Sequence, residues 1–155
     1  MHLSVLDLYT IGIGPSSSHT VGPMRAAVRF ASNAAPRKPA RLSVELFGSL
    51  GLTGKGHGTH LAIVSGMMGK LPESVDPASL QTDYDRMEQS KYLTLASGER
   101  VAFDPHSDLV FNREKSLPHH PNGMQFCAHG AVGNGCLSTI LHSLGGGFII
   151  ADADI

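Results

Sequence analysis

Histidines and hydroxyl-bearing side chains gather in three short stretches rich in glycine or proline. The first is "GIGPSSSHT", residues 12–20, followed by an apolar and basic segment typical of a helix. The second is "GKGHGTH", residues 54–60, and the third is "LPHHPNGM", residues 117–124. Imidazole exchanges protons near neutral pH, and the N-terminus of a helix attracts anions. Together the stretches predict a site that binds a small anion and moves protons.

The first stretch has two interpretations. A small carboxylate or phosphate would fit among its hydroxyls and its imidazole, because the free N–H groups of a helix start favour negative charge. The residues concerned are Ser16, Ser17, Ser18, His19 and Thr20. The simpler alternative is a helix cap, for which one hydroxyl is enough, with Ser18 as the capping residue.

The second stretch places His57 and Thr59 at the start of another predicted helix, where a histidine can move protons and a threonine can hold it or the substrate. His57 and His60 could share a metal ion, but the HExxH pattern is absent and the sequence places no third ligand. A phosphate loop of the Walker type is excluded because Lys55 is followed by Gly56. We therefore predict no metal ligands in this chain.

The third stretch displays His119 and His120 on a turn that needs only its Pro-Asn-Gly sequence to reverse direction. Adjacent histidines in a turn are often simply exposed to solvent, so this stretch is weak when taken alone. Cys127 and Cys136 are too few for an iron–sulfur site, and we expect them to be core thiols.

Composition restricts the classes of protein to consider. The 155 residues suit one domain, residues 1–155, and 41% hydrophobic with 16% charged residues excludes a disordered chain. A formal net charge of −1 gives no basic surplus for nucleic acid phosphates. The first residues show neither a basic n-region nor a long apolar run. We expect a cytoplasmic protein with no membrane span and no nucleic acid partner.

Apolar periodicity predicts helices early in the chain and strands later. Helices are expected at about residues 4–9, 19–34, 58–70 and 79–92, with a half-buried strand at 41–49. Short strands follow, broken at Ser97-Gly98 and Asp104-Pro105, and then a hairpin of residues 123–129 and 136–144 around Asn134-Gly135. "LGGGFII", residues 144–150, predicts a strand bulge or a close approach of two backbones. The fold class is therefore α+β, with helices packed on a mixed or antiparallel sheet.

Four segments in this order resemble the beta domain of bacterial iron–sulfur L-serine dehydratases, also called L-serine deaminases. They are "SVLDLYTIGIGPSSSHTVGPMRAA", "GKGHGTHLAIVSGMMG", "LPHHPNGM" and "SLGGGFI", and the resemblance extends over about residues 4–150. It implies a lyase that converts L-serine to pyruvate and ammonia in serine degradation and gluconeogenesis. It also implies a fold similar to the allosteric substrate-binding domain of D-3-phosphoglycerate dehydrogenase.

The resemblance assigns roles by motif position. It implies proton handling for His57, Thr59 and His120. It implies that the carboxylate or amino group of the substrate is held by Ser16, Ser17, Ser18, His19, Thr20, Asn122 and Gly123. Two positions depart from the family pattern, because His60 and Pro121 stand where acidic residues are frequent, so no ion-pair or metal role is assigned there.

The resemblance also implies partners. An alpha domain or subunit would hold the [4Fe–4S] cluster on its own cysteines, so this chain would be an N-terminal half or a beta subunit, inactive alone. We expect a homodimer. The abrupt end after an apolar strand signal would fit a junction with such a domain. An alternative is a regulatory module that binds serine or a related carboxylate, and a purely structural interpretation treats the motifs as caps and turns.

Overall fold

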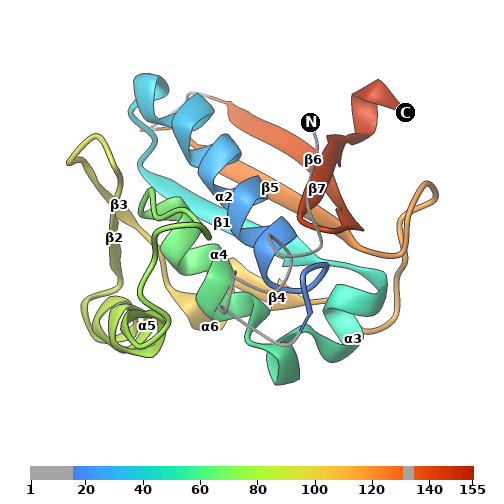
Figure 1. Ribbon diagram of the computed structural model, residues 1–155. Helices are drawn as coiled ribbons and strands as arrows, with labels where there is room; N and C mark the ends of the chain where they lie inside the picture. Colours follow the sequence, from blue (N-terminus) through green and yellow to red (C-terminus); the bar gives the residue numbers. More distant parts are fainter. Residues whose placement is uncertain (1–15, 131–134) are drawn as a thin grey trace.

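The computed structural model describes residues 16–130 and 135–155. The helix predicted at residues 4–9, the first residues of the "GIGPSSSHT" stretch and Asn134 of the predicted hairpin turn lie outside these ranges. Within them, helices α2 and α4 lie across one face of a mixed sheet (Figure 1). The prediction of an α+β fold is confirmed.

Helix α2, Val21–Ala34, confirms the helix predicted at residues 19–34. It forms on an alanine-rich segment whose apolar residues recur at helical spacing, so that Met24 and Ala31 both point into the core. Helix α4, Thr59–Met67, packs directly on α2. The close approach requires Gly66, because a Cβ there would lie 2.4 Å from the carbonyl oxygen of Met24.

The sheet has the strand order β2-β3-β1-β5-β6-β7, and β4 also pairs with β1. Strand β1 is parallel to β3 and β4 but antiparallel to β5, which makes the sheet mixed. The β5–β6 pairing confirms the predicted hairpin, and a register shift between Ser143 and Gly145 confirms the predicted bulge. The strands are β1 Arg41–Leu46, β2 Tyr92–Thr94, β3 Arg100–Ala102, β4 Leu109–Phe111, β5 Gly123–His129, β6 Cys136–Gly145 and β7 Phe148–Ala151.

The core lies between the helices and the sheet. Leu42, Val44 and Leu46 alternate along β1 and are buried, and Phe30 of α2 stacks on Phe126 of β5 with ring centroids 5.1 Å apart. The expectation that both cysteines are core thiols is wrong: Cys136 is exposed and Cys127 is half-buried. Residues alternate between the two faces of a strand, and buried Phe126 precedes Cys127, so the thiol points to the other face of the sheet.

Helix α3, Gly48–His57, was not predicted, because its four glycines suggest a loop. Packing explains one of them, since a Cβ at Gly51 would lie 1.9 Å from the carbonyl oxygen of Asn112. The remaining short elements are α5 Ser79–Ser90, which was predicted, α6 Pro105–Asp108, and the 3-10 turns η1 Ala35–Arg37 and η2 Asp152–Asp154. No helix in residues 16–130 or 135–155 is both long and apolar enough to cross a membrane.

Candidate functional site

His19, just before α2, is bonded on both ring nitrogens. Its Nδ1 lies 2.9 Å from Ser18 Oγ, and its Nε2 lies 3.1 Å from both Ser49 Oγ and Thr53 Oγ1. The Thr53 hydroxyl donates to the Ser49 carbonyl, so Thr53 Oγ1 accepts from an Nε2–H of His19. Burial, and next the nearby His57, lower the pKa of His19 despite an opposing hydrogen bond with Ser49. His19 is therefore a neutral, positioned imidazole.

His57, the last residue of α3, differs from His19 in its hydrogen bonding. The two rings lie 4.6 Å apart between centroids. Nδ1 of His57 lies 2.9 Å from the carbonyl oxygen of Thr53, one turn earlier in the helix. A carbonyl oxygen only accepts, so Nδ1 donates its proton and the neutral ring keeps a lone pair on Nε2. His57 is half-buried and can accept a proton at that atom.

Thr59 and His60 follow Gly58, whose φ of +78° ends α3 and lets α4 begin at once. The Thr59 side chain is fully buried, and its hydroxyl donates to the carbonyl oxygen of His19. His60 packs edge-on against Tyr84, with centroids 5.1 Å apart. The structure therefore gives Thr59 a contact that positions His19, and it gives His60 an aromatic neighbour.

The predicted Ser18 cap on α2 is wrong, because no described side chain caps this helix and the Ser18 hydroxyl bonds to His19 instead. Backbone groups take its place: the amides of Thr20 and Gly22 donate to the carbonyl oxygens of Ser16 and of the residue after it. The next residue is a proline, which has no N–H. An anion at this turn would therefore depend on hydroxyl groups more than on helix N–H groups.

His120 and Asn122 lie in the loop before β5, and Gly123 begins that strand as a buried residue. The backbone N–H of Asn122 donates to His120 Nδ1 at 3.1 Å, which places the proton of the neutral ring on Nε2. Burial, and next the neighbouring His142, lower the pKa of His120. His120 is thus a hydrogen-bond donor at Nε2, whereas His57 is an acceptor at the same atom.

Two contacts join the His19 and His120 regions at one end of the sheet. The Ser143 hydroxyl donates to the Ser18 carbonyl at 2.8 Å, and the Ser49 amide donates to the Pro121 carbonyl at 2.8 Å. Gly48 has a φ of +58°, and a Cβ there would lie 2.1 Å from the Pro121 oxygen. The structure therefore brings "SSSHT", the α3–α4 corner and "HHPNG" to one place.

Several residues that hold this place together were not predicted from the sequence. Thr53 precedes His57 by four positions, and that spacing, like the place of Ser49 in the same helix, would have been informative had α3 been recognised. The others come from strand β6 and the 3-10 turn η2, where no local pattern reveals the contact. These residues are Ser49, Thr53, His142, Ser143 and Asp152.

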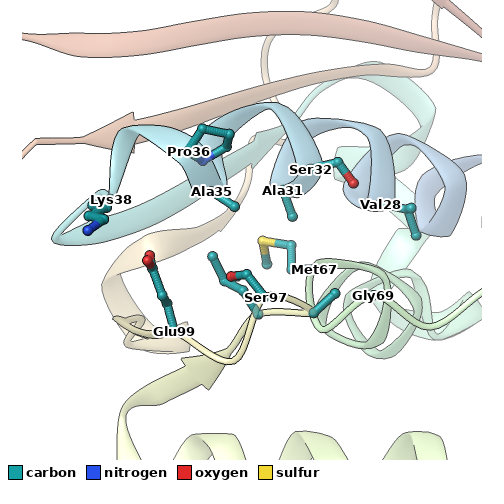
Figure 2. Close-up of a pocket in the computed structure, with 12 residues that line it drawn as sticks. Val28, Ala31, Ser32, Ala35, Pro36, Lys38, Met67, Gly69, Ser97 and Glu99 are labelled. Carbon is teal, nitrogen blue, oxygen red and sulfur yellow. The ribbon is translucent and has the colours of Figure 1, made fainter.

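A separate cavity of about 420 Å³ lies between α2, the end of α4 and the β2–β3 turn. Its walls are mostly apolar, and Figure 2 shows Lys38 and Glu99 at one end of it. No histidine of residues 16–130 or 135–155 lines this cavity.

Comparison with known proteins decides which family the chain belongs to. The family model described as serine dehydratase beta chain matches residues 4–154. The chain belongs to the serine dehydratase beta chain family. It is 44% identical over 154 residues to an L-serine dehydratase of Streptomyces coelicolor, which covers 97% of this chain and 34% of the relative. It is 39% identical over 155 residues to L-serine dehydratase 1 of Escherichia coli, covering 96% of this chain and 33% of that protein.

The chain thus spans about a third of the length of these relatives. The resemblance seen in the sequence motifs is confirmed at the level of the family.

Proposed function

We propose that this chain forms one wall of the active site of an L-serine dehydratase and that His57 removes the α-proton of L-serine. The observation that carries the proposal is the hydrogen bond from His57 Nδ1 to the Thr53 carbonyl. It orients the ring and leaves the Nε2 lone pair for the substrate, which is the arrangement that a general base needs.

The chemistry is an elimination. His57 Nε2 takes the proton from Cα, the electron pair forms the Cα–Cβ double bond, and the Cβ–O bond breaks to release the hydroxyl group. The aminoacrylate product becomes an imine, which water hydrolyses to pyruvate and ammonia. Hydroxide is a poor leaving group, so the hydroxyl needs an electrophile or a proton donor.

A [4Fe–4S] cluster does not fit the residues of this chain. Such a cluster needs three or four thiolates, whereas the chain has two cysteines, one half-buried on β5 and one exposed at the start of β6. We propose that the cluster belongs to an accompanying alpha domain or subunit, and we assign no step on this chain to it. Both relatives are about three times as long as the matched region, which supports a further part of the enzyme.

We assign the substrate carboxylate to His120 and to the serine-rich turn. Nε2–H of His120 can donate to it, and the hydroxyls of Ser16, Ser17 and Ser18 lie at the neighbouring turn, joined to the His120 loop through Ser143. Asn122 and Gly123 shape the loop. His19, Thr20 and Thr59 are positioning residues, because their side chains bond to the turn itself or to its backbone.

Reconstitution tests this proposal. The chain alone should produce no pyruvate from L-serine, and co-expression with a cysteine-bearing alpha chain should restore oxygen-sensitive activity. His57→Ala in the reconstituted enzyme should abolish most of the turnover, with His106→Ala, an exposed histidine of α6, as the control. Pyruvate formation by the iron-free chain alone would contradict the proposal.

The cavity in Figure 2 supports a second candidate, a regulatory site for serine or a related zwitterion. Its volume of about 420 Å³ is within the range of small-molecule sites, and Lys38 and Glu99 offer opposite charges to a carboxylate and an ammonium group. Calorimetry with L-serine on the chain alone tests it. Binding that Glu99→Gln removes and His57→Ala retains would support this regulatory site, and no binding would exclude it.

A further inference from the structure

A cluster of metal-ligating side chains lies beside the proposed site but outside it. Asp152 Oδ1 is 2.8 Å from His119 Nδ1 and 2.8 Å from His142 Nε2. The potential ligand atoms of the three residues all lie within 4.8 Å of one another. His119 comes from the loop before β5, His142 from β6, and Asp152 from η2 at the end of the chain. Among the residues that the structure describes, this is the one such group of three.

We propose that His119, His142 and Asp152 bind a divalent transition-metal ion, and that zinc is the ion their donor set suits best. Two imidazoles and one carboxylate, with a fourth position left for water, form a ligand set that zinc accepts. Bonds of about 2.0–2.1 Å in tetrahedral geometry place donor atoms roughly 3.3 Å apart. The three donors are already near this spacing, so small side-chain movements would admit the ion. This site departs from the prediction that the chain holds no metal ligands.

The burial of His142 fixes one donor of the cluster in place. Its side chain is fully buried, and its Nδ1 has no hydrogen-bond partner among the residues that the structure describes. Its other nitrogen, Nε2, faces the carboxylate of Asp152, so this donor already points into the cluster. A metal on Nε2 would give this ring a strong bond and would place its proton on Nδ1.

The unpartnered Nδ1 also limits the affinity. Ligand histidines usually donate their second N–H to a carbonyl or carboxylate, and that support raises affinity. We therefore expect this site to bind zinc more weakly than structural zinc sites do. Binding should still tie together the loop that carries His120, strand β6 and the end of the chain, and so raise the thermal stability of the protein.

The opposing interpretation is a clasp without metal, in which two N–H groups donate to one carboxylate oxygen.

The experiment uses the chain free of affinity tags, stripped with a chelator and titrated with zinc chloride against a chromophoric competitor. We expect about one zinc ion per chain, a rise in Tm on zinc addition, and a visible absorption band typical of low coordination number when cobalt replaces zinc.

His119→Ala is the main variant, because this side chain is 48% exposed and its removal should leave the fold intact. It should weaken zinc binding by more than about 100-fold, since even outer-shell partners of metal ligands contribute 10- to 100-fold. His106→Ala is the matched control and should bind zinc as the unaltered chain does. Equal zinc affinity in His119→Ala and the unaltered chain, or less than about a tenth of an ion per chain, would overturn the proposal and leave the clasp. Asp152→Asn removes the carboxylate donor and gives a second, independent test, with the same expected loss of zinc affinity.

Discussion

His19 and His142 are both buried histidines at the same end of the sheet, but their hydrogen bonding differs. Both nitrogens of His19 have hydroxyl partners, from Ser18 on one side and from Ser49 and Thr53 on the other. Within the described part of the chain, His142 has a carboxylate partner on one nitrogen and no partner on the other. A histidine satisfied by neutral hydroxyls is fixed as part of the framework. A histidine with an unsatisfied nitrogen and an ionised neighbour is suited to exchange partners.

The two regions also differ in how they are assembled. The hydrogen bond that orients His57 runs along one helix, from its Nδ1 to the carbonyl oxygen of Thr53 four residues earlier. Contacts around Asp152 join residues 10 and 33 positions away in the chain. The hydrogen bond of His57 therefore forms whenever α3 forms, whereas the cluster around Asp152 exists only after the sheet and the chain end have packed.

The largest expected effect tests the division of roles between His57 and His120. In the reconstituted enzyme, His57→Ala should lower kcat by about 10²–10⁴-fold, the usual contribution of a general base. His120→Ala should act mainly by raising KM, because Nε2–H of His120 is a donor to the substrate rather than a proton acceptor. Steady-state pyruvate formation separates the two effects. A kcat loss confined to His120→Ala would reverse the assignment.

The second prediction concerns the contact between α3 and the loop that carries His120. Gly48→Ala adds a Cβ where the φ is +58° and the Pro121 carbonyl oxygen is 2.1 Å away, so the free energy of unfolding should fall by more than about 2 kcal/mol. Gly56→Ala is the control, because a Cβ there meets nothing within 4 Å in the same helix and should stabilise by about 0.5–1 kcal/mol. Urea unfolding of both variants measures the difference. Similar values for the two would show that the contact between Gly48 and Pro121 is not tight.

Much of the fold followed from local pattern. Helix α2, the β5–β6 hairpin and the bulge near Gly145 were predicted because apolar spacing, turn residues and glycines act within a few positions. Helix α3 was not, because its glycines serve close packing against other segments, such as Gly51 on Asn112, and a single sequence shows no such neighbour.

The same limit applies to the candidate site. The motifs identified His57 and His120, but their opposite hydrogen-bonding roles depend on a helix carbonyl in one case and a loop amide in the other. His142 and Asp152 looked unremarkable in the sequence, because one lies in a strand and the other beyond it. Cys136 was predicted to lie in the core from its residue type alone. Its exposure depends instead on which face of the strand it occupies.

A smaller effect concerns the link between Ser143 and the serine-rich turn. Ser143→Ala removes the hydrogen bond to the Ser18 carbonyl and should lower the free energy of unfolding by about 1 kcal/mol, the usual net value of such a bond, and more if the carbonyl stays buried without a partner. Ser107→Ala, at an exposed residue of α6, should change it by less than about 0.5 kcal/mol. Chemical denaturation at neutral pH gives both values. An unchanged free energy of unfolding in Ser143→Ala would mean that the packing of the serine-rich turn on β6 does not depend on this bond.

The smallest expected effect concerns the pH dependence of stability. Burial, and next the nearby Lys55, lower the pKa of His60 below its ordinary value of 6.5. The unfolded chain therefore binds a proton at higher pH than the folded chain, so the stabilising contribution is complete above about pH 6.5 and is lost as the pH falls below it. His19 and His120 have pKa values lowered in the same direction and add to this loss.

His60→Phe should keep the edge-on contact with Tyr84 while removing the titration, so stability should fall less between about pH 7.5 and about pH 5.5 than in the unaltered chain. Urea unfolding at the two pH values measures the change, with His106→Phe as a histidine replaced outside this contact. An equal fall in His60→Phe and the unaltered chain would assign the acid sensitivity to His19 and His120. The loss of stability at low pH would then arise in the proposed site itself, because His19 and His120 lie on its two sides.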